Sequence, residues 1–239
     1  MFGAIPKTAW SRRYPSDKQN GCILAMRSML VRDGNGKIVL VDNGAGNKHL
    51  KQLSYYNFFD LVDLKDELQR RDVACEDVTD VILTHLHFDH CGYTTQKEEQ
   101  TGGKHLFKMA FPNAIHWVSR AQWENFLHPN ALEADSYLIE NMQAVYDSGK
   151  LRLIENDTNL CPGIDLRLFD GHTPGQIAPY ITTPERTYVF AGDVIPLAAS
   201  VSPLWISAYD TYPVVSYNEK MRMLEEAASE KQAVIYCHD

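Results

Sequence analysis

The chain has 239 residues, 44% of them hydrophobic, so it can bury a substantial core without disulfides or a structural metal. Its 31 acidic residues outnumber 23 Lys and Arg, and the basic residues are dispersed, which argues against a nucleic-acid partner. No apolar run reaches the roughly 20 residues of a membrane span, and the first residues lack the apolar core of a secretion signal. We therefore expect no membrane partner and a cytoplasmic location. The five widely spaced cysteines do not describe a disulfide framework.

The first part of the chain predicts sheet, then helix, then sheet. Residues 22–31 and 38–44 are aliphatic runs on either side of RDGNGK, which indicates two strands joined by a turn. Residues 60–71 carry Leu61, Leu64 and Leu68 at helical spacing and predict an amphipathic helix. The apolar run 81–83 predicts a buried strand. The polar, glycine-containing segment 93–111 predicts a mobile surface loop.

The second part repeats this alternation. We expect a strand at 114–119, a helix capped by Ser119, and another helix over 134–149 that Gly149 ends. The runs LRLI, DLRLF, APYITT and TYVFAGD predict a second group of strands, followed by a final helix at 217–231 and a last buried strand, AVIY. This order favours an α+β fold with two packed sheets and helices outside, a four-layer αββα sandwich. We expect a single domain over residues 1–239, with trimming at both ends left open.

The segment THLHFDHCG, residues 84–92, follows the predicted strand at 81–83 directly. Imidazole and carboxylate are ligands that borderline metals such as Zn²⁺ prefer. In an extended segment His85 and His87 project to the same side and can bind one ion, while Asp89 and His90 follow after a turn and can serve a second ion. The alternative for any one histidine is a hydrogen-bonded core residue, but three within six residues favour a metal site.

Three later residues repeat the pattern of an apolar strand followed by a ligand. His172 lies in DGHTPGQ, Asp193 ends TYVFAGD, and His238 lies in AVIYCHD. Each has an ordinary explanation when taken alone, since Asp193 could cap a turn and His238 could lie in a frayed terminus. Their joint occurrence favours one metal centre built from distant segments.

With these motifs the chain resembles the metallo-β-lactamase superfamily, and FGAIPKTAW, VDNGAGNK and GDVIPLAASVSPLWISAYDTYP are similar to the branch that contains methyl parathion hydrolase and quorum-quenching N-acyl-homoserine lactonases. The resemblance implies the αββα fold and two divalent metal ions, zinc first, with iron or manganese as alternatives. It also implies the ligands: His85, His87 and His172 for one ion, Asp89, His90 and His238 for the other, and Asp193 bridging both.

Two features depart from the family pattern. Relatives in that branch usually have an additional strand before the FG of FGAIPK and more chain after the histidine that corresponds to His238. Some lactonases of the superfamily have a tyrosine three residues beyond the bridging aspartate, where this chain has Pro196. The role of that tyrosine therefore does not transfer directly.

The implied function is a dinuclear-metal hydrolase in which a metal-bridging hydroxide opens lactones or cleaves small-molecule esters. Asp89 is the candidate catalytic residue, since it can orient the hydroxide and protonate the leaving group. Asp42 and Asp170 are candidate acceptors behind the ligand histidines. An aromatic substrate pocket and a homodimer are further expectations. The pocket candidates are Trp10, Phe88, Trp205, Tyr209 and Tyr212.

Other functions stay open at this stage. A phosphotriesterase of the methyl parathion hydrolase type needs the same two ions, and a glyoxalase II-like thioesterase has a similar metal motif but usually a C-terminal extension. A flavin-linked redox function is disfavoured, because such members carry Glu where this chain has His87 and add a flavin domain. A noncatalytic metal-binding sensor is the alternative from a different class.

Overall fold

The computed structural model describes residues 1–98 and 106–239. These residues form two compact units, which are described separately here. The histidine-loop unit comprises Ser28–Val118 and Ala134–Leu153. The C-terminal unit comprises Met1–Arg27, Ser119–Glu133 and Ile154–Asp239. The prediction of one domain over residues 1–239 stays a prediction.

A five-stranded mixed sheet forms the centre of the histidine-loop unit, with strand order β1-β2-β3-β6-β7. Its strands are β1 (Met29–Arg32), β2 (Ile38–Val41), β3 (Asp80–Ile82), β6 (Ile115–Ser119) and β7 (Leu151–Ile154). β1 and β2 pair antiparallel across the predicted turn, and β3 lies parallel to both β2 and β6. Val39, Val81 and Ile82 are fully buried, as expected for apolar strands in the middle of a sheet.

The helical elements of this unit are short. They are α2 (Leu64–Gln69), α3 (Phe88–Cys91) and α5 (Gln143–Asp147), with the 3₁₀ turns η1 (Ser54–Tyr56), η2 (Cys75–Asp77), η3 (Ala134–Ser136) and η4 (Ile139–Asn141). The helix predicted over 60–71 begins only at Leu64, because Asp60 has a positive φ and the Asp63 carboxylate caps the first turn. Leu61 is consequently exposed.

Two predictions in this unit were wrong in part. The helix predicted over 134–149 is broken into 3₁₀ turns and the short α5, and the Asn141 side chain turns inward to the sulfur of Cys91. Gly149 does follow the helix end, with φ +72°. The segment predicted as a surface loop at 93–111 contains an antiparallel hairpin of β4 (Thr95–Glu98) and β5 (Leu106–Met109). The remainder of that prediction, residues 99–105, lies outside the described residues.

The C-terminal unit is built on a second five-stranded sheet, with order β12-β11-β10-β9-β8. Its strands are β8 (Thr158–Cys161), β9 (Ile164–Phe169), β10 (Gln176–Thr182), β11 (Thr187–Phe190) and β12 (Ala233–Ile235). All neighbours pair antiparallel except β11 and β12, which are parallel. The helical elements are α1 (Lys7–Trp10), α4 (Arg120–Leu127), α6 (Pro213–Ser229), η5 (Gly192–Val194) and η6 (Ala198–Ser200).

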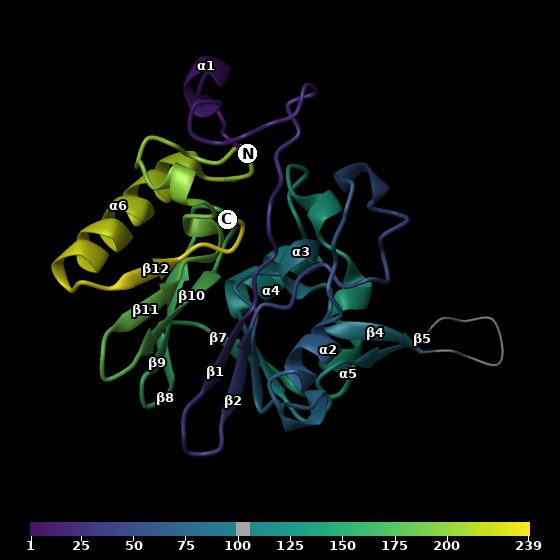
Figure 1. The fold of residues 1–239 in the computed structure, drawn as a ribbon. Helices are drawn as coiled ribbons and strands as arrows, with labels where there is room; N and C mark the ends of the chain where they lie inside the picture. Colours follow the sequence, from purple (N-terminus) through teal and green to yellow (C-terminus); the bar gives the residue numbers. More distant parts are fainter. Residues whose placement is uncertain (99–105) are drawn as a thin grey trace. The chain divides into compact units, whose positions relative to one another are not determined.

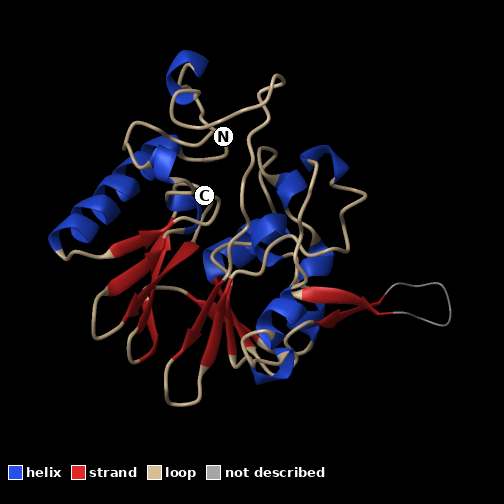
Figure 2. Cartoon of the chain, viewed as in Figure 1, coloured by secondary structure: helices blue, strands red, loops and turns tan. Residues whose placement is uncertain are grey.

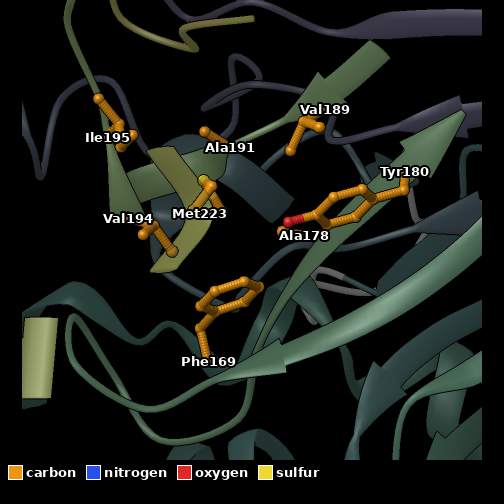
Figure 3. Packing of buried hydrophobic residues seen from close by; sticks show 8 residues of the cluster. All are labelled: Phe169, Ala178, Tyr180, Val189, Ala191, Val194, Ile195 and Met223. Atoms are coloured by element: carbon orange, nitrogen blue, oxygen red, sulfur yellow. The ribbon is translucent and has the colours of Figure 1, made fainter. Parts of the chain in front are cut away.

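The helix α6 lies along this sheet (Figure 1) and closes a core with it. Met223 of the helix packs with Phe169 and Tyr180 of the strands, as Figure 3 shows. Arg167, from β9, lies over the Tyr180 ring and pairs with Glu226 of the helix. Burial of large apolar side chains here, each contributing about 1.5–3 kcal/mol, holds α6 against the strand ends that carry the site.

Two strand predictions need correction. LRLI is strand β7 of the first sheet, beside β6, rather than part of the second group. The last strand, β12, is half-buried rather than buried, because it is an edge strand that pairs only with β11. The α+β class is confirmed by the mixed sheets and helices (Figure 2). No helix among the described residues is long and apolar enough to cross a membrane.

Candidate metal centre

In the histidine-loop unit, strand β3 ends at Ile82, and a segment without regular secondary structure leads to His87, whose backbone is extended, before α3 begins. His85 and His87 lie on the extended part, with ring centroids 4.5 Å apart, and His90 lies on the helix with its ring centroid 3.9 Å from that of His85. All three histidines are buried. The turn into α3 therefore gathers three imidazoles within one short segment.

Asp42 is the acceptor behind two of these histidines. It follows β2, the parallel neighbour of β3, so the ends of the two strands meet at one edge of the sheet. The Asp42 carboxylate accepts from Thr84 N and Thr84 Oγ1, each at 2.8 Å, and lies 2.8 Å from His90 Nδ1. Thr84 Oγ1 is in turn 3.0 Å from His85 Nδ1. Because the Thr84 hydroxyl proton goes to Asp42, its oxygen can accept from His85 Nδ1–H.

These contacts assign the protons of both rings. With Nδ1–H donating to an acceptor, neutral His85 and His90 carry their lone pair on Nε2, which is the form that ligates a metal. The Asp89 carboxylate, a quarter exposed, lies 3.7 Å from His90 Nε2. The His87 ring packs 4.9 Å from that of Tyr137.

In the C-terminal unit, three strand ends bring the other candidates together. His172 lies in the connection from β9 to β10, Asp193 in η5 after β11, and His238 just after β12. The start of antiparallel β10 and the ends of parallel β11 and β12 fall on the same edge of the sheet. Asp193 Oδ2 is 3.5 Å from His172 Nε2, and Asp193 Oδ1 is 3.1 Å from His238 Nε2.

The other ring nitrogen of each histidine again faces an acceptor. His172 Nδ1 lies 3.0 Å from Asp210 Oδ1, and His238 Nδ1 lies 2.7 Å from the Ala25 carbonyl oxygen. Asp170, the predicted acceptor, instead accepts from the backbone N–H of Gly175 within the loop. Sequence reasoning missed Asp210, although it lies in the quoted stretch GDVIPLAASVSPLWISAYDTYP, because no local pattern connects this loop residue with the distant His172.

The donor chemistry of this group fits a cation. A neutral imidazole with its proton on Nδ1 turns a lone pair toward the Asp193 carboxylate, and two lone pairs facing each other repel unless a positive charge lies between them. Burial by itself lowers the pKa of His238, but Cys237 and Asp193 raise it, and the net pKa is well above 6.5. The Asp193 carboxylate therefore favours a positive charge at His238 Nε2, which a proton supplies and which a bound cation would supply in its place.

Cys237 is a hydrogen-bond donor in this group. Burial raises the pKa of its thiol, and its Sγ lies 3.1 Å from Asp193 Oδ1 and 3.2 Å from the Gly192 carbonyl oxygen. A protonated thiol orients the carboxylate rather than ligating a metal. The side chains that could hold a metal thus come from both units. They are His85, His87 and His90 in one, and His172, Asp193 and His238 in the other.

The predicted pocket residues lie in aromatic clusters or at the surface. Trp10 stacks on Phe2 at 5.1 Å between ring centroids, and Trp205 meets Phe2 edge-on at 6.0 Å. Phe88 is buried in the histidine-loop unit beside Tyr56, at 4.9 Å. Tyr209 and Tyr212 are about half exposed. Their role in a substrate pocket stays a prediction.

Comparison with known proteins places these residues in a family. Residues 27–93 match the model of the metallo-β-lactamase superfamily. A crystal structure of a probable metal-dependent hydrolase from Staphylococcus aureus is 32% identical, with a TM-score of 0.90 over 100% of this chain and 83% of that one. The dizinc quorum-quenching lactonase AidC, in complex with a product, N-hexanoyl-L-homoserine, is 21% identical, with a TM-score of 0.69 over 90% of this chain and 72% of that chain.

The curated relatives are N-acyl homoserine lactonases. The N-acyl homoserine lactonase AiiA of Bacillus thuringiensis subsp. kurstaki is 25% identical over 178 residues, which cover 72% of this chain. An N-acyl homoserine lactonase of Bacillus sp. is 28% identical over 184 residues. The chain spans 60% of the length of these relatives. The matched segment, the shared fold and the histidine motif together show that the chain belongs to the metallo-β-lactamase superfamily.

Proposed function

We propose that the chain is a metal-dependent hydrolase that binds two divalent ions, zinc first, and opens lactones or cleaves related esters. The observation that carries the proposal is the assignment of ring protons in both units. Nδ1 of His85, His90, His172 and His238 each faces an acceptor, which leaves Nε2 as the ligating atom. One such histidine could be an ordinary core residue, but four with the same ring nitrogen available fit a metal centre better.

The ligand set of the proposal divides between the units. His85 and His87 would hold one ion together with His172, and Asp89 and His90 would hold the other together with His238. Asp193 would serve both, because its two oxygens face two different imidazoles. Divalent ions, when bound there, polarise the substrate oxygen and lower the pKa of water from 15.7 to about 7.

The residues of the chain then have distinct tasks. Asp42 and Asp210 hold ligand imidazoles in one tautomer, and Cys237 orients the Asp193 carboxylate. Asp89 takes one proton from the attacking water and returns it to the leaving alkoxide. The water oxygen forms a bond to the acyl carbon as the ring C–O bond breaks, so one lactone and one water give one hydroxy acid.

The lactone as substrate class is supported by the lactonases among the relatives. The test is a panel of homoserine lactones, aryl esters, thioesters and phosphotriesters, measured on purified chain whose metal content is determined. We expect about two equivalents of divalent metal per chain and the highest kcat/KM on lactones. Faster turnover of phosphotriesters or thioesters would reassign the substrate class.

His87→Ala and His128→Ala form the matched pair for this test. His87 is buried and His128 is exposed on the surface. We expect His87→Ala to lose lactonase activity and bound metal, and His128→Ala to keep both. Full activity in His87→Ala would refute the proposed site. The cytoplasmic location and the homodimer stay predictions from the sequence.

A further inference from the structure

Two loops of the C-terminal unit meet at His172. The first, residues 170–175, joins β9 to β10, and the second, residues 197–212, leads into α6 and is mostly irregular (Figure 2). Besides the contact of His172 Nδ1 with Asp210, the His172 carbonyl oxygen accepts from Thr211 N at 3.0 Å and from Thr211 Oγ1 at 2.9 Å. The orientation of the imidazole therefore depends on how these loops are held against each other.

Glu219, on α6, holds the first loop. Its two carboxylate oxygens accept from the backbone N–H groups of Asp170, at 2.8 Å, and Gly171, at 2.9 Å, the two residues that precede His172. Carboxylates that accept from backbone N–H groups form hydrogen bonds about twice as strong as neutral ones. The side chain thus fixes the backbone directly before the histidine.

Lys220, the next residue, holds the second loop. Its Nζ donates to the carbonyl oxygens of Ser200, at 3.0 Å, and Trp205, at 2.7 Å. The side chain is 1% exposed, and burial of a lysine is costly unless its donors are satisfied. A buried ammonium that binds two loop carbonyls indicates that the path of this loop matters.

The close approach of α6 to the first loop adds a third constraint. A Cβ on Gly171 would lie 2.4 Å from Cα of Ser216, so only glycine allows the helix backbone to come so near. The helix itself is fixed to the sheet by the core around Met223 (Figure 3). It can therefore serve as a rigid support for both loops.

We propose that Glu219 and Lys220 are positioning residues for the metal-ligand histidine His172. The Glu219 carboxylate binds the backbone of the loop that carries His172. The Lys220 ammonium binds carbonyl groups of the loop that carries Asp210, the acceptor for His172. This inference rests on the proposed function for the identity of the ligand. The contacts themselves do not require a bound metal.

The experiment compares Glu219→Gln and Lys220→Met with two surface controls, Glu225→Gln on the same helix and Lys231→Met just beyond its end. Glu225 and Lys231 are both exposed. The first readout uses metal-free, full-length chain near neutral pH, below the pKa of about 8 to which burial lowers the Lys220 ammonium. It records the ¹⁵N shifts of the two His172 ring nitrogens, assigned by their loss in His172→Gln. We expect the shifts to move toward a mixture of tautomers in the two test variants and to stay unchanged in the controls.

The second readout is zinc affinity, measured by competition with a chromophoric chelator. We expect about tenfold weaker binding in Glu219→Gln and Lys220→Met, the lower end of the cost of losing a residue that orients a ligand. Thermal unfolding separates this effect from a general loss of stability, and Glu219→Gln tests the inference by itself if Lys220→Met fails to fold. Ring shifts and affinity equal to those of the controls would overturn it. A wild-type chain that binds no zinc while the ring shifts still respond would instead overturn the proposed function.

Discussion

The histidine-loop unit and the C-terminal unit hold their histidines in different ways. In the former, Asp42 accepts from His90 Nδ1 and, through Thr84, serves His85 Nδ1 as well. In the latter, each histidine has its own acceptor, Asp210 for His172 and a backbone carbonyl for His238. With a shared acceptor, the orientation of two histidines depends on one side chain. With separate acceptors, each histidine depends on its own partner. The two arrangements should therefore respond differently to single substitutions.

The largest effect is expected at Asp193, where the separate histidines of the C-terminal unit meet. Asp193→Asn keeps the shape but removes the charge between two imidazoles, so we expect metal affinity and kcat/KM to fall by more than about 100-fold, beyond the range for residues behind the ligands. Elemental analysis and kinetics on a lactone measure both. Metal content equal to that of wild type would show that Asp193 is not a ligand.

The comparison between the units is sharpened by Asp42→Asn and Asp210→Asn. Loss of an acceptor behind a ligand histidine weakens metal affinity by about 10–100-fold. We expect Asp42→Asn near the upper end of this range, because Asp42 serves two histidines, and Asp210→Asn near the lower end, because Asp210 serves one. Asparagine also tolerates the positive φ of residue 42, so the backbone there is not strained. Zinc competition titrations on the two variants measure the difference. Equal losses would break the distinction between shared and separate acceptors.

In the histidine-loop unit, His116 should make stability depend on pH. His116, on β6, is fully buried, and burial lowers its pKa to about 4, against a weaker opposing effect of the Ala114 backbone. The unfolded chain binds this proton near pH 6.5, so stability is fully present above that pH and is lost as the pH falls toward 4. The expected loss by pH 5 is about 2 kcal/mol. Urea unfolding of wild type and His116→Phe at pH 7 and pH 5 isolates it, because the variant should lack this component.

The smallest effect concerns the attachment of α6 in the C-terminal unit. Glu226 accepts two hydrogen bonds from Arg167 Nη1, at 2.8 and 2.7 Å, but both side chains are about one-third exposed. Solvent screens such a pair, so Glu226→Gln should cost no more than about 1 kcal/mol of unfolding free energy and leave zinc affinity unchanged. Urea unfolding measures the loss of stability. A loss above this limit would mean that the ion pair is not screened by solvent as expected.

The sequence predicts the local parts of this protein well. The first hairpin, the strand β3, and the helix α4 capped by Ser119 follow from apolar runs, turn residues and a capping side chain, and all are present. The helix over 134–149 failed because buried contacts of residues such as Asn141 override helical propensity. The hairpin β4–β5 was missed because β4, TQKE, is polar and β5, LFKM, has only four residues, so neither shows an apolar periodicity.

The same division applies to the candidate metal centre. The sequence by itself determined which side chains are available, because THLHFDH is compact and the later candidates each follow an apolar strand. Only the tertiary structure decided which acceptor stands behind each imidazole. Asp210 reaches His172 across a loop and through contacts with α6, and such a contact between residues far apart in the chain depends on the packing of helix and sheet rather than on any local pattern.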